Sequence, residues 1–390
     1  MNPRLLHIKE SATIKIADIA RKMERSGIRV VKLQTGDPDF DTPSIITDAA
    51  YQAMKEGLTH YSESRGLPTL RKALAEKLRK DNNVIFDPDR EILVTHGAAH
   101  GIFITMQSLI SPGDEVILIE PYYMSYAASI QLAGGVPIPI RTNPNKDFVV
   151  DIENIRASIS PRTKIIVLNS PCNPSGVVLG SETIQAIKEI VMEHNLFILS
   201  DEVYEHIIFD GRRNISISSL PDMHERTIIV NSFSKTYAMT GWRIGYLAAP
   251  AYIVDQMLKV LQYSATNIAP FTQRAAIVAL QTPELLNYIE MMRDTYNKRR
   301  LSGLSVVEEF QNLRVVKPAG AFYLMVDVSQ CCLDSFSFAS QLLEQEHVAV
   351  VPGSAFGESS EGWIRLTFAV PQEIFMEGIR RIGRFAKTQI

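Results

Sequence analysis

The chain has 390 residues, and its hydrophobic fraction of 46% provides enough apolar surface for packed cores, which excludes disorder as its main state. Its 40 basic and 43 acidic side chains give a net charge of −3, so no basic excess exists to bind nucleic-acid phosphates. The chain contains only three cysteines, no apolar leader and no apolar run of membrane-spanning length. These features favour a cytoplasmic protein without nucleic-acid or membrane partners.

Short apolar, β-branched runs recur through the first two thirds of the chain and are typical of strands that are buried on both faces. We predict such strands at 91–95, 115–119, 164–168, 196–199, 227–230 and 246–249. Helix-length segments lie between several of them, at 101–110, 123–132 and 181–195. This alternation predicts an α/β fold with a mostly parallel central sheet covered by helices.

The pattern changes after about residue 280. A long charged helical stretch at 283–311 is followed by strand-like pieces at 314–317, 321–328 and 348–351 and by a final helix. This order is typical of a smaller α+β domain. We therefore expect a large domain at 45–285 and a small domain built from 1–44 and 286–390.

Several well-known catalytic motifs are absent. The sequence contains no Gly-x-Gly pair, which excludes the dinucleotide fingerprint, and no P-loop or G-x-S-x-G elbow. His96 and His100 are four residues apart, but no carboxylate or cysteine at ligand spacing accompanies them, so we expect no metal. An α/β enzyme of this kind still needs a cofactor or anion site at the carboxyl ends of its strands.

A lysine follows one of the predicted strands directly. The strand at 227–230 runs into Ser232, Ser234 and Lys235, and Arg243 follows eight residues later. A partly desolvated lysine near another cation has a lowered pKa and is suited to a Schiff base. Hydroxyl groups and an arginine are suited to a phosphate. The alternative is a surface lysine in a loop with a structural arginine.

Three other strand ends also carry polar or small residues. Asp201 and Tyr204 follow the strand at 196–199, where a carboxylate can hold a proton on a pyridine ring or cap a helix. Asn173 follows the strand at 164–168 and can reach a cofactor hydroxyl or simply form a turn. Gly97 and the small residues after it lead from the strand at 91–95 into a helix, where backbone N–H groups can bind a phosphate.

Four segments together resemble a known family. They are TGDPDFDTP at 35–43, NSPCNPSG at 169–176, SDEVYEHIIFDG at 200–211 and SFSKTYAMTGWRIGY at 232–246. From Ser11 to Thr367 the chain resembles the class I, fold-type I aminotransferases that depend on pyridoxal 5'-phosphate (PLP), in their aspartate aminotransferase-like branch. The resemblance implies PLP as cofactor and ping-pong transfer of an amino group from an L-amino acid to a 2-oxo acid through a Schiff base on Lys235.

The resemblance also implies roles for individual residues. The catalytic residues would be Lys235, Asp201 and Tyr204. The cofactor-binding residues would be Gly97, Ala98, Ala99, Tyr123, Asn173, Asp201, Tyr204, Ser232, Ser234, Lys235, Arg243 and Tyr61. The substrate-binding residues would be Gly36, Asn173 and Arg365. Tyr61 matches a tyrosine that reaches the phosphate of the neighbouring subunit, which implies a homodimer with shared active sites.

The role of Arg365 also has a physical rationale. A planar bidentate donor orients the α-carboxylate of an amino acid so that the Cα–H bond stands perpendicular to the cofactor plane. The alternative is a strand arginine in a surface ion pair.

The sequence departs from the family pattern at two positions that concern the substrate. Ala99 stands where several relatives acting on acidic amino acids have lysine, and Tyr123 stands where many aspartate-specific relatives have tryptophan. These differences weaken aspartate as the donor and leave aromatic, neutral or unusual amino acids open. His60, His96 and His100 either read a polar substrate side chain or form hydrogen bonds within turns.

Two other functions remain open at this stage. The first is another PLP reaction on the same scaffold, such as β- or γ-elimination, cyclisation or cyclopropane formation, because the carbanion chemistry belongs to the cofactor. The second is a non-catalytic effector domain of a transcription regulator. The net charge of −3 and a family match that begins by Ser11 leave no place for an added DNA-binding domain.

Overall fold

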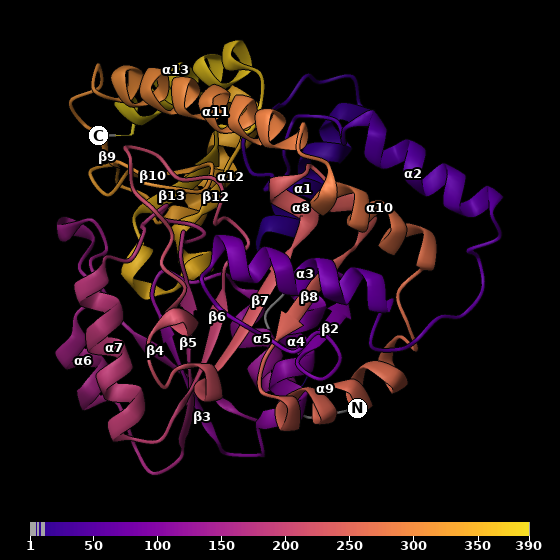
Figure 1. Cartoon of the computed structure of the whole chain (residues 1–390). Helices are drawn as coiled ribbons and strands as arrows, with labels where there is room; N and C mark the ends of the chain where they lie inside the picture. Colours follow the sequence, from indigo (N-terminus) through magenta and orange to yellow (C-terminus); the bar gives the residue numbers. More distant parts are fainter. Residues whose placement is uncertain (1–4, 6–7, 9–11, 390) are drawn as a thin grey trace.

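The computed structural model describes residues 5, 8 and 12–389 (Figure 1). Within these residues, seven strands form the larger sheet, in the order β2-β8-β7-β6-β5-β3-β4. The strands are β2 (Ile92–Thr95), β3 (Glu115–Ile119), β4 (Val136–Ile140), β5 (Thr163–Asn169), β6 (Phe197–Asp201), β7 (Thr227–Ser232) and β8 (Gly245–Ala248). Only β8 pairs antiparallel with its neighbours, so the mostly parallel sheet is confirmed.

Helices cover both faces of this sheet because successive strand residues point to opposite sides. The helices of the larger part are α2 (Ser44–Lys55), α3 (Pro68–Asp81), α4 (Gly97–Leu109), α5 (Ser125–Ala133), α6 (Ile152–Ala157), α7 (Ser181–Glu193), α8 (Phe233–Thr236), α9 (Ala251–Ser264) and α10 (Pro270–Gln281). Leu199 packs with α4, α5 and α9, whereas the preceding Ile198 packs with α7 on the other face. Residues of α2, α3 and α10 complete that second face beside β2 and β8.

The C-terminal part forms a second, smaller sheet that is antiparallel, in the order β12-β13-β10-β9. Its strands are β9 (Arg314–Val316), β10 (Tyr323–Asp327), β12 (Val351–Pro352) and β13 (Trp363–Thr367). The accompanying helices are α11 (Leu285–Val307), α12 (Ser335–Glu346) and α13 (Gln372–Lys387). Figure 1 shows α11 and α13 packed together above the small sheet.

The N-terminal segment joins the C-terminal part. It contains α1 (Ala12–Arg25) and β1 (Val31–Lys32), and β1 pairs in parallel with β11 (Val348–Ala349). Residues 33–42 then lead from this pair toward the larger sheet. Among the described residues, every helix is too short or too polar to cross a bilayer.

Among the described residues, three strands lie outside the predicted set: β1, β4 and β13. β1 has only two residues, which is too short to give a pattern in the sequence. The edge strand β4 has the sequence VPIPI, and two prolines mask its strand pattern, although prolines are tolerated at an edge. β13 carries Arg365 within an otherwise ordinary apolar run. Helix α4 begins at Gly97, four residues before the predicted start, so Gly97, Ala98 and Ala99 form its first turn.

Candidate active site

Three neighbouring parallel strands of the larger sheet, β5, β6 and β7, end beside one another. Asn169 at the end of β5 pairs with Asp201 at the end of β6, and Asp201 pairs with Val230 of β7. The turns that follow these strands therefore meet at one edge, which is where ligands bind in open α/β sheets. This edge, which we call the carboxyl edge, gathers Asn173 and Lys235 around Asp201.

Lys235 lies in the short helix α8, directly after β7. Its Nζ donates a hydrogen bond to the carbonyl oxygen of Gly36, which comes from the N-terminal segment. Burial lowers the pKa of Lys235 to about 8, and the positive charges of Arg365 and Arg243 add to this effect. A lowered pKa leaves more of the amine neutral, and the neutral amine is the nucleophile.

Asp201 is buried and held by two hydrogen bonds. The Tyr126 hydroxyl donates to its Oδ2 at 2.6 Å, and the Val203 N–H donates to its Oδ1 at 3.3 Å. Burial raises the pKa of Asp201 to about 6, while these two hydrogen bonds oppose the rise. Three residues later, the Tyr204 hydroxyl shares a hydrogen bond of 2.8 Å with the Tyr323 hydroxyl. A carboxylate fixed in this way can hold a proton on a ring nitrogen.

Arg365 extends from β13 of the small sheet and is buried. Its Nη1 donates to Asn173 Oδ1 at 2.9 Å and its Nη2 donates to the Gln34 carbonyl at 2.7 Å. The guanidinium carbon lies 4.4 Å from the ring centre of Tyr323. Within the described chain, Arg365 Nε is buried without a hydrogen-bond partner and no carboxylate forms an ion pair with this side chain. The free energy cost of this buried charge is recovered when an anion binds.

The amino end of α4 lies against Arg243. A Cβ atom at Gly97 would stand 2.8 Å from Arg243 Nη2, and one at Gly245 would stand 2.8 Å from the Gly97 carbonyl carbon. Only glycine permits both approaches, and Gly97 also has a positive φ of 74°. Nearby, Ser232 Oγ accepts a hydrogen bond from the Ser234 N–H at 3.4 Å. Free N–H groups of a first helical turn, an arginine and two hydroxyls are a donor set for a phosphate.

The residues at the carboxyl edge fit PLP. Lys235 offers an amine for the aldehyde, and Asp201 offers a buried carboxylate for the ring nitrogen. Gly97 allows the Arg243 guanidinium to lie against the first turn of α4, and Gly245 allows β8 to approach Gly97. The unpartnered Nε of Arg365 is suited to a substrate carboxylate on the same side of the fold.

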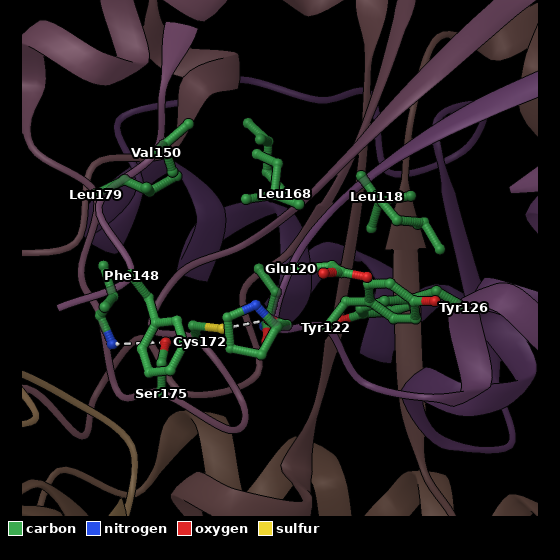
Figure 2. A pocket seen from close by; sticks show the side chains of 15 residues that line it. Leu118, Glu120, Tyr122, Tyr126, Phe148, Val150, Leu168, Cys172, Ser175 and Leu179 are labelled. Atoms are coloured by element: carbon green, nitrogen blue, oxygen red, sulfur yellow. Dashed lines mark hydrogen bonds between the residues drawn. The ribbon is translucent and has the colours of Figure 1, made fainter. Parts of the chain in front are cut away.

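A cavity of about 40 Å³ lies beside Tyr126, and Figure 2 shows side chains that line it. Its walls are mostly aliphatic and aromatic, and of the described residues none of the predicted cofactor ligands lines it. Cys172 borders it, and its Sγ donates to the Pro121 carbonyl oxygen at 3.5 Å. Burial raises the pKa of this thiol, which keeps it protonated. The cavity therefore contributes no nucleophile to the site.

Four predicted residues lie apart from the buried groups. Tyr61 is 88% exposed, and His60 is also on the surface. His100 Nδ1 accepts a hydrogen bond of 3.3 Å from the His96 N–H, and its Nε2 lies 3.1 Å from Ser264 Oγ. Burial lowers the pKa of both histidines, that of His100 to about 4. The His100 ring therefore forms hydrogen bonds with the His96 backbone and with Ser264, and the His96 ring contacts the backbone of Asn267.

Three residues of the site were not predicted: Tyr126, Tyr323 and Gln34. Tyr126 lies three residues after Tyr123, so the helical pattern could have placed it near the strand end. Tyr323 lies in the predicted strand at 321–328, but only the pairing of β10 with β13 brings it to Arg365. Gln34 acts through its backbone carbonyl, which leaves no signal in the sequence.

Comparison with known proteins supports this reading. A model of the family "Aminotransferase class I and II" matches residues 28–382, which include both sheets. The chain is 41% identical to the aspartate aminotransferase of Pyrococcus abyssi, over 100% of this chain and 99% of that protein. It is 38% identical to aromatic-amino-acid aminotransferase 2 of Thermococcus litoralis, with the same coverage. The solved structure of the Thermus thermophilus aspartate aminotransferase with maleate is similar, with a TM-score of 0.93 at 38% identity and 99% coverage of each chain.

Proposed function

The chain belongs to the class I and II aminotransferases, and on this premise we propose which residues carry out the transfer. It is a PLP-dependent transferase that moves an amino group from an L-amino acid to a 2-oxo acid by the ping-pong mechanism of the family. This membership favours amino-group transfer over the elimination, cyclisation and effector-domain alternatives.

One observation supports the assignment of Lys235 most strongly. Its amine has a pKa lowered to about 8 and lies near both Asp201 and Arg365. When bound, PLP supplies the carbonyl that takes the amino group and the ring that accepts the electrons of the Cα–H bond. Lys235 Nζ anchors the cofactor covalently and, once displaced, takes the proton from the substrate Cα. Its lowered pKa favours the neutral form that this task requires.

The other groups hold the cofactor. Asp201 keeps a proton on the ring nitrogen, and Tyr126 keeps the carboxylate oriented. Tyr204 and Asn173 would donate to the phenolic oxygen of a bound ring, and Tyr123 would stack on its face. The phosphate would be bound by three kinds of donor: the backbone N–H groups of the first turn of α4 at Gly97, Ala98 and Ala99, the hydroxyls of Ser232 and Ser234, and the guanidinium of Arg243.

Arg365 binds the α-carboxylate of the substrate, beside the backbone of Gly36 and the side chain of Asn173. Support comes from its unpartnered Nε and from the two hydrogen bonds that fix the guanidinium plane. A bidentate pair orients the Cα–H bond as well as binding the substrate.

We propose that the preferred donors are L-amino acids with aromatic or neutral side chains. Ala99 provides no cation for an acidic side chain, and Tyr123 replaces the tryptophan of aspartate-specific relatives. The test follows the rate at which phenylalanine or aspartate removes the visible absorption of the PLP-loaded enzyme, and its recovery with a 2-oxo acid. We expect the kcat/KM of this first half-reaction to be at least about tenfold higher for phenylalanine than for aspartate. A higher value for aspartate would contradict the proposal.

The proposal extends to assembly, location and domains. Tyr61 is 88% exposed, which suits a side chain that completes the phosphate site of a second copy in a homodimer. Size measurement in solution tests this, and a monomer that turns over at full rate contradicts it.

Free cysteines at 172, 331 and 332 suit a cytoplasmic location. The pairing of β1 with β11 supports a small domain of 1–44 and 286–390 beside a large domain of 45–285.

A further inference from the structure

A polar cluster is buried between α3 and the turns that follow β6 and β7. It consists of five side chains: Lys77 of α3, Asn82 at the end of α3, Glu202 and Glu205 after β6, and Asn231 of β7. The side chain of Lys77 is 11% exposed and that of Glu205 is 5% exposed. Buried charges of this kind persist only when they are paired and hydrogen-bonded.

Glu205 lies at the centre of this cluster. It forms an ion pair with Lys77 Nζ, which also donates to Asn82 Oδ1 at 2.8 Å. Asn82 Nδ2 donates to Glu205 Oε2 at 2.7 Å and to Glu202 Oε2 at 2.8 Å. Although burial opposes ionisation, the charge of Lys77 holds the pKa of Glu205 below its usual value. Glu205 is therefore a charged acceptor for Lys77, Asn82 and Asn231.

The cluster reaches the phosphate-binding turn through Asn231. Its Nδ2 donates to Glu205 Oε1 at 2.6 Å, and its Oδ1 accepts the Ser232 N–H at 2.7 Å. An amide has one donor end and one acceptor end, so the carboxylate of Glu205 fixes which end faces Ser232. Ser232 Oγ then accepts the Ser234 N–H at the start of the helix that carries Lys235.

The cluster has no room for a ligand of its own. The cavity beside Lys77, Glu205 and Asn231 has a volume of about 10 Å³, which corresponds to one water molecule at most. Within the described chain, no group of three or more histidine, cysteine, aspartate or glutamate side chains is arranged to hold a metal. The hydrogen bonds of the cluster instead connect the turn after β6 with the turn after β7.

We propose that Glu205 is a positioning residue for the cofactor. Through Asn231, Glu205 fixes the position of the turn that carries Ser232 and Lys235 relative to the turn that follows Asp201. The inference rests on the proposed function, because the ligand whose affinity it controls is PLP.

The experiment measures the PLP dissociation constant of the apoenzyme by absorption, well below the melting temperature. The variants are Glu205→Gln, Asn231→Asp and the double variant, with Glu115→Gln as a matched buried carboxylate at the other end of the sheet. Glu205→Gln places an NH₂ group against the Lys77, Asn82 and Asn231 donors, so one hydrogen bond is lost. Asn231→Asp places a second carboxylate against that of Glu205, so the two repel. The double variant exchanges acid and amide and restores a donor–acceptor pair, and the carboxylate that Asn231→Asp introduces still accepts the Ser232 N–H.

We expect the dissociation constant to rise about tenfold in each single variant and to return to within about threefold of wild type in the double variant. Glu115→Gln leaves it unchanged. If Glu205→Gln does not fold, Asn231→Ala removes the same link and is expected to raise the constant equally. Unchanged affinity in the single variants, or no recovery in the double variant, overturns the positioning role alone. A wild-type apoenzyme that binds no PLP overturns the proposed function as well.

Discussion

The two ends of the large sheet treat buried charge differently. At the amino end, Glu115 is buried and fully engaged: Arg162 pairs with its Oε1 at 2.6 Å, and Ser160 and Thr163 donate to its Oε2. At the carboxyl edge, Lys235 and the Arg365 side chain that reaches this edge from the small sheet are desolvated. Within the described chain no carboxylate forms an ion pair with either, unlike Lys77, which pairs with Glu205 nearby.

This difference separates structural from functional charge. A buried charge that is paired stabilises the fold or costs it little, whereas a buried charge without a counterion costs free energy. We propose that the carboxyl edge retains that cost because a bound cofactor and a substrate carboxylate would supply the missing partners. At the amino end, the hydrogen-bonded pair of Glu115 and Arg162 links β3 to the turn before β5.

The largest expected effect is that of Lys235→Ala. Loss of the amine removes both the covalent anchor and the base, so kcat falls by roughly 10³- to 10⁴-fold. At the amino end, Glu115→Gln keeps kcat within about twofold of wild type. Steady-state rates of the PLP-saturated variants measure both. Comparable losses in the two variants would remove the distinction between the two ends.

A smaller effect is expected when one arginine is changed at each end. Arg365→Met removes the donor for the substrate carboxylate and lowers kcat/KM by roughly 10²-fold, with most of the change in KM. Arg162→Met leaves kcat/KM unchanged and lowers the free energy of unfolding by roughly 1 kcal/mol. Steady-state kinetics and urea unfolding of both variants test this difference. A loss of kcat/KM in Arg162→Met, with loss of stability alone in Arg365→Met, would contradict it.

Tyr126→Phe tests the hydrogen bond that holds Asp201. That bond lowers the pKa of Asp201, so its removal raises the pKa above the present value of about 6. The carboxylate then becomes protonated at a higher pH, and PLP affinity begins to fall at a higher pH on the acid side. Near pH 7 we expect roughly a tenfold weaker affinity. A titration of PLP binding between about pH 5 and pH 8 that matches wild type would exclude this role.

The smallest effect concerns Asp37, whose negative charge raises the pKa of Lys235. Asp37→Asn keeps the Oδ1 acceptor for Thr240 but removes this charge. The pKa of Lys235 therefore falls, and the rate at which the apoenzyme takes up PLP reaches its plateau at a lower pH than in wild type. An upward displacement of the plateau would show that Asp37 does not act on Lys235 by its charge.

The central sheet could be predicted from the sequence because strands buried on both faces are continuous apolar runs. All six predicted strands correspond to strands of the seven-stranded sheet. β4 was missed because its prolines at 137 and 139 conceal an edge strand. The smaller sheet was predicted only in outline, since its pairing depends on contacts between distant segments.

Residues that follow a strand directly, such as Asp201 and Lys235, could be proposed from local chemistry and from the resemblance. Tyr126 could have been proposed from its helical spacing to Tyr123. Tyr323 and Gln34 could not, because their contacts with the site arise from tertiary packing. The link from Glu205 to Ser232 is likewise invisible in the sequence, because it passes through one amide whose orientation only the fold determines.

The central claim is that the carboxyl edge keeps a desolvated amine ready for PLP. The direct measurement is uptake of PLP by the apoenzyme as a function of pH, followed by borohydride reduction and peptide mapping of the label. The account predicts a rate that rises through about pH 8, with the label on Lys235. It also predicts no label on Lys77, a mostly buried lysine that is paired with Glu205. A label on Lys77 or on a surface lysine, or a midpoint near the ordinary lysine value of 10.5, would contradict it.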